Sequence, residues 1–291
     1  MTGRRRARLA AALVLAVAGS APAAWRPGRE SLHRPRSAAA GIAVATLAWA
    51  DDAVEREAAA GKDGWRRIKP GESVRTGDRL RTARHGVARI EFPWMSLTAG
   101  PATVMHIPAE VVLSTVLGEG RAEFEGRGRD IVKVRTAEAV IRGAGRIVVR
   151  REQERTLVMA MAMDGSFSVA ASGRTVVLRA GEGTVVRDGQ PPGPSRELPK
   201  PPRTVRPGSD PFYVPQGRPV LLSWSPAAPA SHVQVMPLES NEVLLARDAG
   251  LPPLALLIPW EGTYRWRVSS REPDGLEGRP SEEGLICVVE K

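Results

Sequence analysis

Short runs in which apolar and polar residues alternate are the feature that most limits the folds open to this chain. Residues 88–92, for example, read Ala-Arg-Ile-Glu-Phe, and similar runs recur from Trp65 to Val289, separated by turns that contain glycine. Side chains along a strand point alternately to two faces, so a period of two predicts strands with one buried face. No stretch carries a long apolar face of period 3.6. The sequence therefore predicts an all-β protein.

Residues 74–82 show the pattern most clearly. Gly77-Asp78 separates two short alternating runs, with Val74 and Leu80 expected to face inward. Glycine tolerates positive φ and aspartate bonds nearby backbone, so this dipeptide predicts a tight turn. About ten such strands with closely spaced turns follow down to residue 187, which is typical of a sandwich or jelly roll.

The first 50 residues are predicted to be an export signal. A basic start is followed by the apolar run Leu9–Ala18, and a second, largely apolar run covers Ala38–Leu47. This is the signal-peptide pattern, with cleavage expected after Ala50 or after Ala23, and Ala50 is favoured because domain-like sequence follows it directly. Both runs are shorter than the roughly 20 residues that span a bilayer, so no stable membrane span is expected after cleavage. An uncleaved anchor is the alternative.

The charge of the chain is concentrated in this leader. The formal net charge is +10, but residues 1–50 hold eight arginines and one acid, which leaves 34 basic and 31 acidic residues in 51–291. A nucleic-acid-binding protein usually keeps its basic patch on the folded domain, so no nucleic-acid partner is expected.

The domain organisation predicted from these patterns has four parts: a leader over 1–50, a β domain over 51–190, a proline-rich linker over 191–210 and a second β domain over 211–291. The linker holds seven prolines between residues 191 and 207 and is expected to be an extended spacer. About seven strands and a core tryptophan in the last part favour an immunoglobulin-type sandwich.

Several short motifs of the first domain resemble, in their order, the FecR extracytoplasmic domain. They cover about residues 70–187 and are Gly77-Asp78-x-Leu80-x-Thr82, Leu117-x-x-Gly120-x-x-x-Phe124, Val134-Arg-Thr136, Ile141-Arg-Gly143, Thr156-x-Val158 and Gly181-Glu182. The match departs after Gly143, where Ala144 and Arg146 replace the family's Thr and Phe. The resemblance implies a jelly-roll-like or sandwich FecR domain. The second domain resembles immunoglobulin or fibronectin type III modules, in which a tyrosine such as Tyr264 forms a tyrosine corner.

Residues that carry chemistry are few. The four histidines show no paired spacing, and the single cysteine, Cys287, lies in an apolar strand and is expected to be a buried core residue. The sequence offers no residues for a catalytic, cofactor or metal site, and no cofactor is expected. Met159, Met161 and Met163 share one strand face and could bind Cu(I), but core packing is the preferred interpretation.

The function expected from these observations is an exported, non-enzymatic binding or scaffold protein of the cell envelope. Its partner would be an envelope protein or a cell-wall glycan. One alternative is a component of FecR-type signalling to a sigma factor, although the chain has no room before residue 51 for the family's cytoplasmic segment. The other alternative is an enzyme whose site has no identifiable residues.

Overall fold

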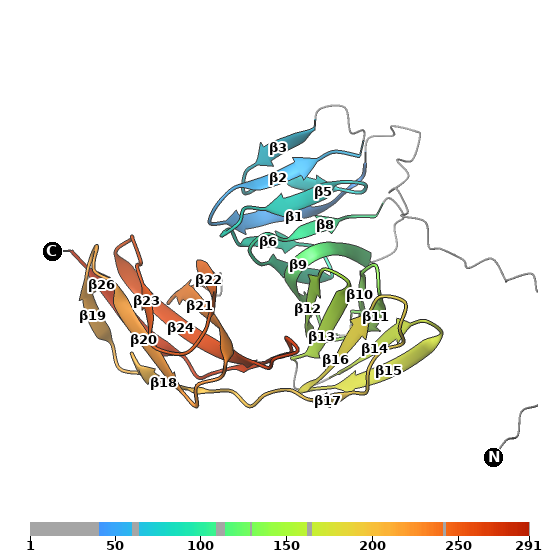
Figure 1. The fold of residues 1–291 in the computed structure, drawn as a ribbon. Helices are drawn as coiled ribbons and strands as arrows, with labels where there is room; N and C mark the ends of the chain where they lie inside the picture. The colour runs from blue at the N-terminus through green and yellow to red at the C-terminus, as the bar shows by residue number, and fades with distance from the viewer. Residues whose placement is uncertain are drawn as a thin grey trace, which may run out of the picture. The chain divides into compact units, whose positions relative to one another are not determined.

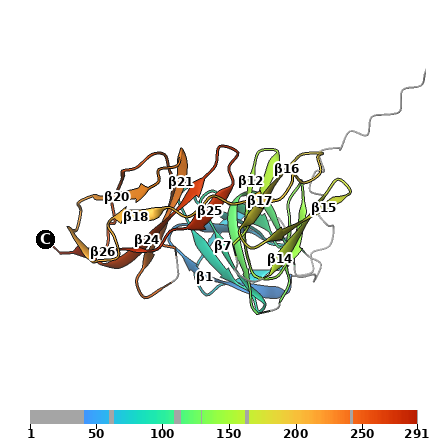
Figure 2. The same cartoon turned by 90° about the horizontal axis from the view of Figure 1, so that it is seen from below.

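A computed structural model describes residues 41–59, 64–108, 114–128, 130–161, 165–240 and 243–290. The predicted leader up to residue 40, with its Ala23 cleavage site, lies outside the described residues, as do Met163 and Asp164. The described residues form strands and no helix, which confirms the all-β class. Strands β1–β17 build a first sandwich and strands β18–β26 a second one, drawn blue to yellow and orange to red (Figures 1 and 2).

The first sandwich consists of two sheets that share the long strand β9 (Ser114–Gly126). Sheet I has the order β4-β1-β6-β7-β9-β12-β13-β16-β17. Its other strands are β4 (Ser73–Arg75), β1 (Ala43–Ala50), β6 (Ala88–Glu91), β7 (Met95–Ala99), β12 (Arg146–Glu152), β13 (Arg155–Ala160), β16 (Glu182–Arg187) and β17 (Arg196–Glu197).

Sheet II has the order β3-β2-β5-β8-β9-β10-β11-β14-β15. Its other strands are β3 (Trp65–Ile68), β2 (Val54–Glu57), β5 (Arg79–Thr82), β8 (Val104–His106), β10 (Val132–Arg135), β11 (Val140–Gly143), β14 (Ser166–Ala171) and β15 (Arg174–Arg179). All neighbours are antiparallel except β9 and β10, which are parallel. The sequence predicted about ten strands down to residue 187, and the described residues between 54 and 187 form fifteen, β2 to β16.

The core of the first sandwich lies between these two sheets. Its largest fully buried side chains are Phe124, Phe167, Leu47, Leu80, Ile90, Met95, Leu97, Met105, Leu117, Ile141 and Ile147. They occupy alternate positions of their strands, as the period of two predicts. Gly77 has a φ of +84°, and the Asp78 carboxylate accepts a hydrogen bond from the backbone N–H of Arg75 at 2.8 Å, which confirms the predicted tight turn.

Strand β9 passes from sheet II to sheet I at Gly120. Residues before the glycine pair with β8 and β10, and residues after it pair with β7 and β12. Gly120 has a φ of +95°, and a Cβ built on it would lie 2.6 Å from Thr103 Cα. A sandwich corner is often made by a strand that changes sheet at a bend. Gly120 is the glycine of the Leu117-x-x-Gly120 motif, so the motif marks this corner.

Replacing Gly120 with alanine is expected to lower the free energy of unfolding by about 2–4 kcal/mol, because the positive φ and the contact with the Thr103 backbone both oppose a Cβ. Urea unfolding followed by tryptophan fluorescence measures the loss. Gly128→Ala is the matched control, since Gly128 has a φ of +62° but open space around its Cβ position, and it should cost about 1 kcal/mol. Equal losses in the two variants would contradict the steric argument.

Strand β1 corrects the predicted boundary between leader and domain. The strand covers Ala43–Ala50, which the sequence analysis assigned to the leader, and it pairs with β4 on one side and β6 on the other. Leu47 is fully buried within it. The second apolar run therefore supplies a core strand, and the folded domain begins before residue 51. An apolar run of small residues is compatible with a signal segment and with a strand, so its composition does not distinguish the two.

The second sandwich pairs a three-stranded sheet with a six-stranded one. Sheet III has the order β18-β20-β23, and sheet IV has the order β19-β26-β24-β21-β22, with β25 added on β24. The strands are β18 (Arg203–Arg206), β19 (Phe212–Pro215), β20 (Val220–Ser225), β21 (Ala230–Pro237), β22 (Leu245–Ala249), β23 (Leu254–Leu256), β24 (Gly262–Arg271), β25 (Glu277–Pro280) and β26 (Gly284–Val289).

Two tryptophans and a tyrosine fill the core of the second sandwich. Trp224 and Trp266 are buried, and the Trp266 indole N–H donates to the Pro207 carbonyl at 3.1 Å. The Tyr264 hydroxyl lies 3.1 Å from the carbonyls of Trp260 and Glu261, which is the geometry of a tyrosine corner. Cys287 is 9% exposed, in keeping with the expected core cysteine.

The proline-rich segment is not the free spacer that its composition predicts. Strand β17 pairs with β16, and β18 pairs with β20, so the second sandwich begins at Arg203 rather than at residue 211. Leu198 between them is buried in an apolar cluster. Proline restricts φ without preventing edge pairing, so a proline-rich composition does not exclude short strands.

The Asp164-Gly165 dipeptide has the residue types of a hairpin turn, but it does not join paired strands. Strands β13 and β14 on either side of it do not pair with each other, because β13 belongs to sheet I and β14 to sheet II. By contrast, Ser172-Gly173 joins the paired strands β14 and β15.

Candidate functional site

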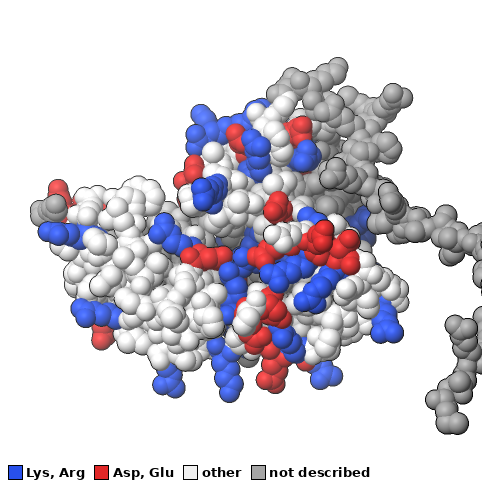
Figure 3. Space-filling model, viewed as in Figure 1, with Lys and Arg blue, Asp and Glu red and all other residues white. Residues whose placement is uncertain are grey.

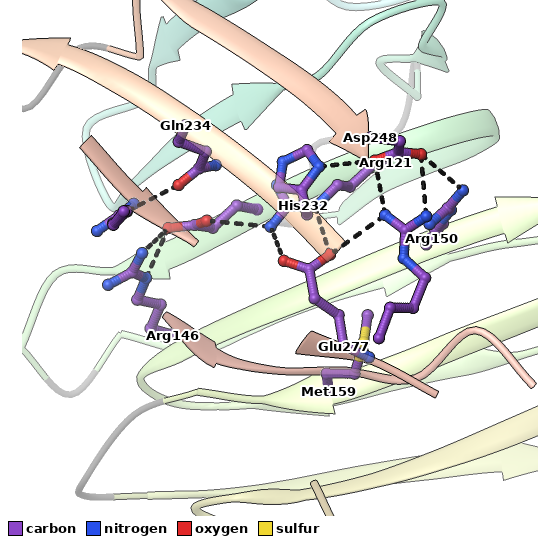
Figure 4. Close-up of polar contacts among 11 residues, drawn as sticks. Arg121, Arg146, Arg150, Met159, His232, Gln234, Asp248 and Glu277 are labelled. Carbon is purple, nitrogen blue, oxygen red and sulfur yellow. Dashed lines mark hydrogen bonds and ion pairs between the residues drawn. The ribbon is translucent and has the colours of Figure 1, made fainter. Parts of the chain in front are cut away.

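The outward faces of the two sandwiches meet in a charged layer. On the first sandwich the layer is carried by β9, β12 and β13, and on the second by β21, β22, β24 and β25. Nine residues form what we call the interdomain charge network: Arg121, Glu123, Arg146, Arg150, His232, Asp248, Arg267, Arg271 and Glu277 (Figure 4). Polar and apolar residues alternate along these strands, and the apolar residues face the two cores.

The centre of the network is the pair Arg121–Glu277. Arg121 Nε lies 3.2 Å from one Glu277 carboxylate oxygen, and Arg121 Nη2 lies 3.0 Å from the other. Arg121 is 8% exposed and Glu277 is 1% exposed. A buried guanidinium and carboxylate joined by two hydrogen bonds form a strong, oriented contact, and here it joins β9 to β25.

Two further groups of charges flank this pair. Glu123 accepts a hydrogen bond from Arg146 Nε at 2.6 Å and lies 3.8 Å from Arg121 Nη2. On the other side Asp248 accepts two hydrogen bonds from Arg271, at 2.7 and 2.9 Å, and lies 2.8 Å from His232 Nδ1.

Apolar side chains from both sandwiches border the network. Val148, Leu157 and Met159 of the first sandwich pack with Leu198 and Leu276. Elsewhere Val87 packs with Met236 and Val243 of the second sandwich, with Trp49 and Ala246 beside them. The layer thus combines buried ion pairs with ordinary hydrophobic contacts.

Met159 belongs to this border and not to an open methionine site. It is fully buried, and its sulfur lies 3.1 Å from the backbone N–H of Glu277 (Figure 4). Met161 packs partly buried against the same cluster. Core packing, the interpretation preferred from the sequence, therefore accounts for the two described methionines of the Met159, Met161, Met163 set.

Burial and the neighbouring cationic groups shift the pKa values of the network's carboxylates in opposite directions. Burial alone would raise the pKa of Glu277, but Arg121, His232 and Arg271 outweigh it and hold the pKa at about 2. Burial likewise raises the pKa of Asp248, while hydrogen bonds from His232 and Arg271 lower it well below its usual value. The pKa of Glu123 is also lowered, because Arg146, Arg121 and Arg267 exceed the effect of burial.

Acid is therefore expected to weaken the contact. Glu277 has a pKa of about 2 when folded and an ordinary value of 4.5, so its contribution is fully present above pH 4.5 and is lost as the pH falls towards 2. The contribution is on the order of 3 kcal/mol. Urea unfolding of the wild type and of Glu277→Gln should show a gap at pH 7 that shrinks at pH 3. The exposed Glu261→Gln control should follow the wild type at both pH values. A gap that is independent of pH would contradict the assignment.

A cleft of about 740 Å³ opens beside the network. It is lined from the first sandwich by residues of β9, β12, β13 and the β5–β6, β7–β8 and β12–β13 connections, and from the second sandwich by His232 and residues 246–248 of β22. Its arginines are Arg84, Arg121, Arg150, Arg151, Arg155 and Arg247, and its carboxylates are Glu119, Glu152 and Asp248.

Sequence reasoning nominated no site residues and missed this layer. His85 and His232 both line the cleft, whereas His106 lies on β8. Arg and Glu on the outward face of a strand are normally solvated, so these residue types did not indicate a buried charged layer. The usable signal was Leu157–Met161, an unbroken apolar run that indicates a strand buried on both faces.

Three structural findings bear on the other expectations. Among the described residues no three or more His, Cys, Asp or Glu side chains gather as a metal site would require. On the face drawn in Figure 3, acidic and basic side chains lie interspersed. No helix long and apolar enough to cross a membrane occurs in the described part of the chain.

Comparison with known proteins finds only weak structural similarity. No family model matches the chain, and no curated protein matches it. Two crystal structures of a "putative anti-sigma factor" from Parabacteroides distasonis are similar to it, each at 20% identity and a TM-score of 0.34. Each match covers 41% of this chain and 59% of the other.

Proposed function

We propose that this chain is an exported, non-enzymatic binding or scaffold protein of the bacterial cell envelope. The observation that carries the proposal is the interdomain charge network, in which the buried Arg121–Glu277 pair fixes two sandwiches against each other beside a cleft. A bidentate buried pair specifies orientation as well as contact. Two β-sandwiches held in this way offer a surface for a partner, either an envelope protein or a cell-wall glycan.

The absence of a nominated catalytic group supports a binding role. His232 and Asp248 form a pair that could act as a base, but Asp248 also accepts two hydrogen bonds from Arg271. The hydroxyl-bearing residue opposite His232 is Ser269 on β24. His232 Nε2 has no hydrogen-bond partner among the described residues, so the His232–Asp248 pair holds no nucleophile in hydrogen-bond contact.

Fractionation and affinity capture test this proposal. Antibody against the chain should find it in the envelope fraction, with an N-terminus that begins after the leader. Cross-linking in intact cells, followed by capture of a tagged chain, should recover an envelope protein or cell-wall fragments. An intact Met1 in the cytosolic fraction would refute export, and capture that is unchanged when the chain is denatured would refute specific binding.

Envelope signalling is the second candidate. The ordered FecR-like motifs favour it, and three of their glycines, Gly77, Gly120 and Gly181, have positive φ values of 84°, 95° and 83°. Deletion of the gene should then remove a transcript that depends on a sigma factor. An unchanged set of transcripts after deletion would leave the scaffold role alone.

A further inference from the structure

The cleft beside the charge network contains two buried side-chain nitrogens that have no partner within the described residues. Arg150 and His232 both line it, and His232 is only 3% exposed. Arg150 Nη1 and His232 Nε2 are buried and have no hydrogen-bond partner among the described residues. Buried polar groups are normally paired, so Arg150 Nη1 points to an acceptor, and His232 Nε2 to a second polar contact, that the protein does not supply.

The other nitrogens of these side chains are already engaged, which fixes their orientation. Arg150 Nη2 faces Asp248 at 3.4 Å, and it also pairs with Glu152. His232 Nδ1 faces Asp248 at 2.8 Å. Asp248 thus orients both side chains.

Arg84 and Arg247 complete the cleft. They come from different sandwiches, both are exposed, and neither has a carboxylate partner within the described residues. The other arginines of the cleft are paired: Arg121 with Glu277, Arg151 with Glu138, and Arg150 and Arg155 with Glu152. Arg84 and Arg247 are therefore cationic groups available to a ligand.

We propose that this cleft binds a small anion that carries phosphate or carboxylate oxygens. The planar guanidinium presents paired donors that match both groups, and a volume of about 740 Å³ suits a ligand of sugar or sugar-phosphate size. The ligand bridges the two sandwiches, with its charged group over Arg150 and His232 and with Arg84 and Arg247 at the rim. This inference deepens the proposed binding function and rests on it, since it names the chemical class of the ligand.

Calorimetric titration of the purified full-length chain at pH 7 tests the proposal. The probes are inorganic phosphate, glycerol 3-phosphate and glucuronate, with N-acetylglucosamine as the neutral probe, all at one ionic strength set with sodium chloride. Saturable one-to-one binding is expected for at least one anionic probe and not for the neutral sugar. Binding of glycerol 3-phosphate alone assigns a phosphate ligand, and binding of glucuronate alone assigns a carboxylate ligand.

Variants locate the binding. The double variant Arg84→Gln/Arg247→Gln should weaken the anion's affinity about tenfold or more, because charged hydrogen bonds are lost. The matched double variant Arg142→Gln/Arg218→Gln removes one exposed arginine from each sandwich outside the cleft and should bind as the wild type does. Both double variants replace exposed side chains, so their thermal unfolding midpoints should agree with that of the wild type.

Three results would overturn the proposal: no saturable binding of any anionic probe, equal binding of the neutral sugar, or equal weakening by the two double variants. These results would leave the proposed envelope role standing if capture in cells still recovered a partner. The two proposals can therefore fail separately.

Discussion

A chain that starts at Asp51 is expected not to fold, whereas one that starts at Gly41 should be as stable as the full-length protein. The shorter chain lacks β1, which lies between β4 and β6 in sheet I. It loses the fully buried Leu47, which also exchanges backbone hydrogen bonds with Gly71 and Glu72. Removal of an interior strand should abolish most of the roughly 5–15 kcal/mol by which a domain is stable. Soluble yield, far-ultraviolet circular dichroism and the cooperativity of urea unfolding measure the outcome.

A point variant separates the strand from the leader. Leu47→Ala in the full-length chain should cost about 2–5 kcal/mol, since it leaves a cavity in the core. Ile42→Ala changes an exposed side chain just before the same strand and should cost little. Cooperative unfolding of the chain from Asp51 with the midpoint of the full-length protein would show that β1 is dispensable. The result also bears on export, because cleavage after Ala50 removes β1 and cleavage after Ala23 retains it.

The fold class could be predicted from the sequence because burial on one face of a strand leaves a period of two. The alternation in β6 and β7 places Ile90 and Leu97 in the core, as the pattern requires. Turn chemistry was equally readable where it depends on a few adjacent residues, as at Gly77-Asp78 and Ser172-Gly173. These features depend on adjacent residues, so a single sequence is enough to predict them.

The pairing of strands could not be predicted in the same way. The Asp164-Gly165 dipeptide has hairpin chemistry, yet the chain crosses there from sheet I to sheet II. Gly120 was recognised within a motif, but its role at the corner of β9 depends on the Thr103 backbone, which lies far away in the sequence. Pairing depends on distant contacts that local patterns do not record.

The charged layer was missed for a related reason. Alternation shows that Arg121 and Glu123 point away from the core of their own sandwich, but not whether water or a second sandwich lies beyond them. Equal numbers of opposite charges on two strands are compatible with both arrangements. Only complementary partners such as Glu277 distinguish them, and these lie more than a hundred residues away.

Replacing Glu277 with alanine is expected to cost about 3–5 kcal/mol, because it leaves the Arg121 guanidinium buried without its carboxylate. The double variant Arg121→Met/Glu277→Leu should recover most of this loss, since well-packed apolar residues can replace a buried ion pair. Urea unfolding of the wild type, Arg121→Met, Glu277→Leu and the double variant measures the coupling. Glu283→Ala is the control, because the Glu283 side chain, which pairs with Arg265, is 38% exposed. This variant should cost no more than about 1 kcal/mol.

The same variants test whether the network couples the two sandwiches. With Arg121 and Glu277 paired, the sandwiches share a buried contact and should unfold in one transition. Loss of the pair leaves the longer Arg150–Asp248 contact and the smaller apolar borders around Met159 and Met236, so Glu277→Ala should split calorimetric unfolding into two transitions. The apolar double variant keeps the contact dry and should restore a single transition. If Glu277→Ala costs as little as Glu283→Ala and unfolds in one step, the bordering apolar contacts, and not the ion pair, hold the sandwiches together.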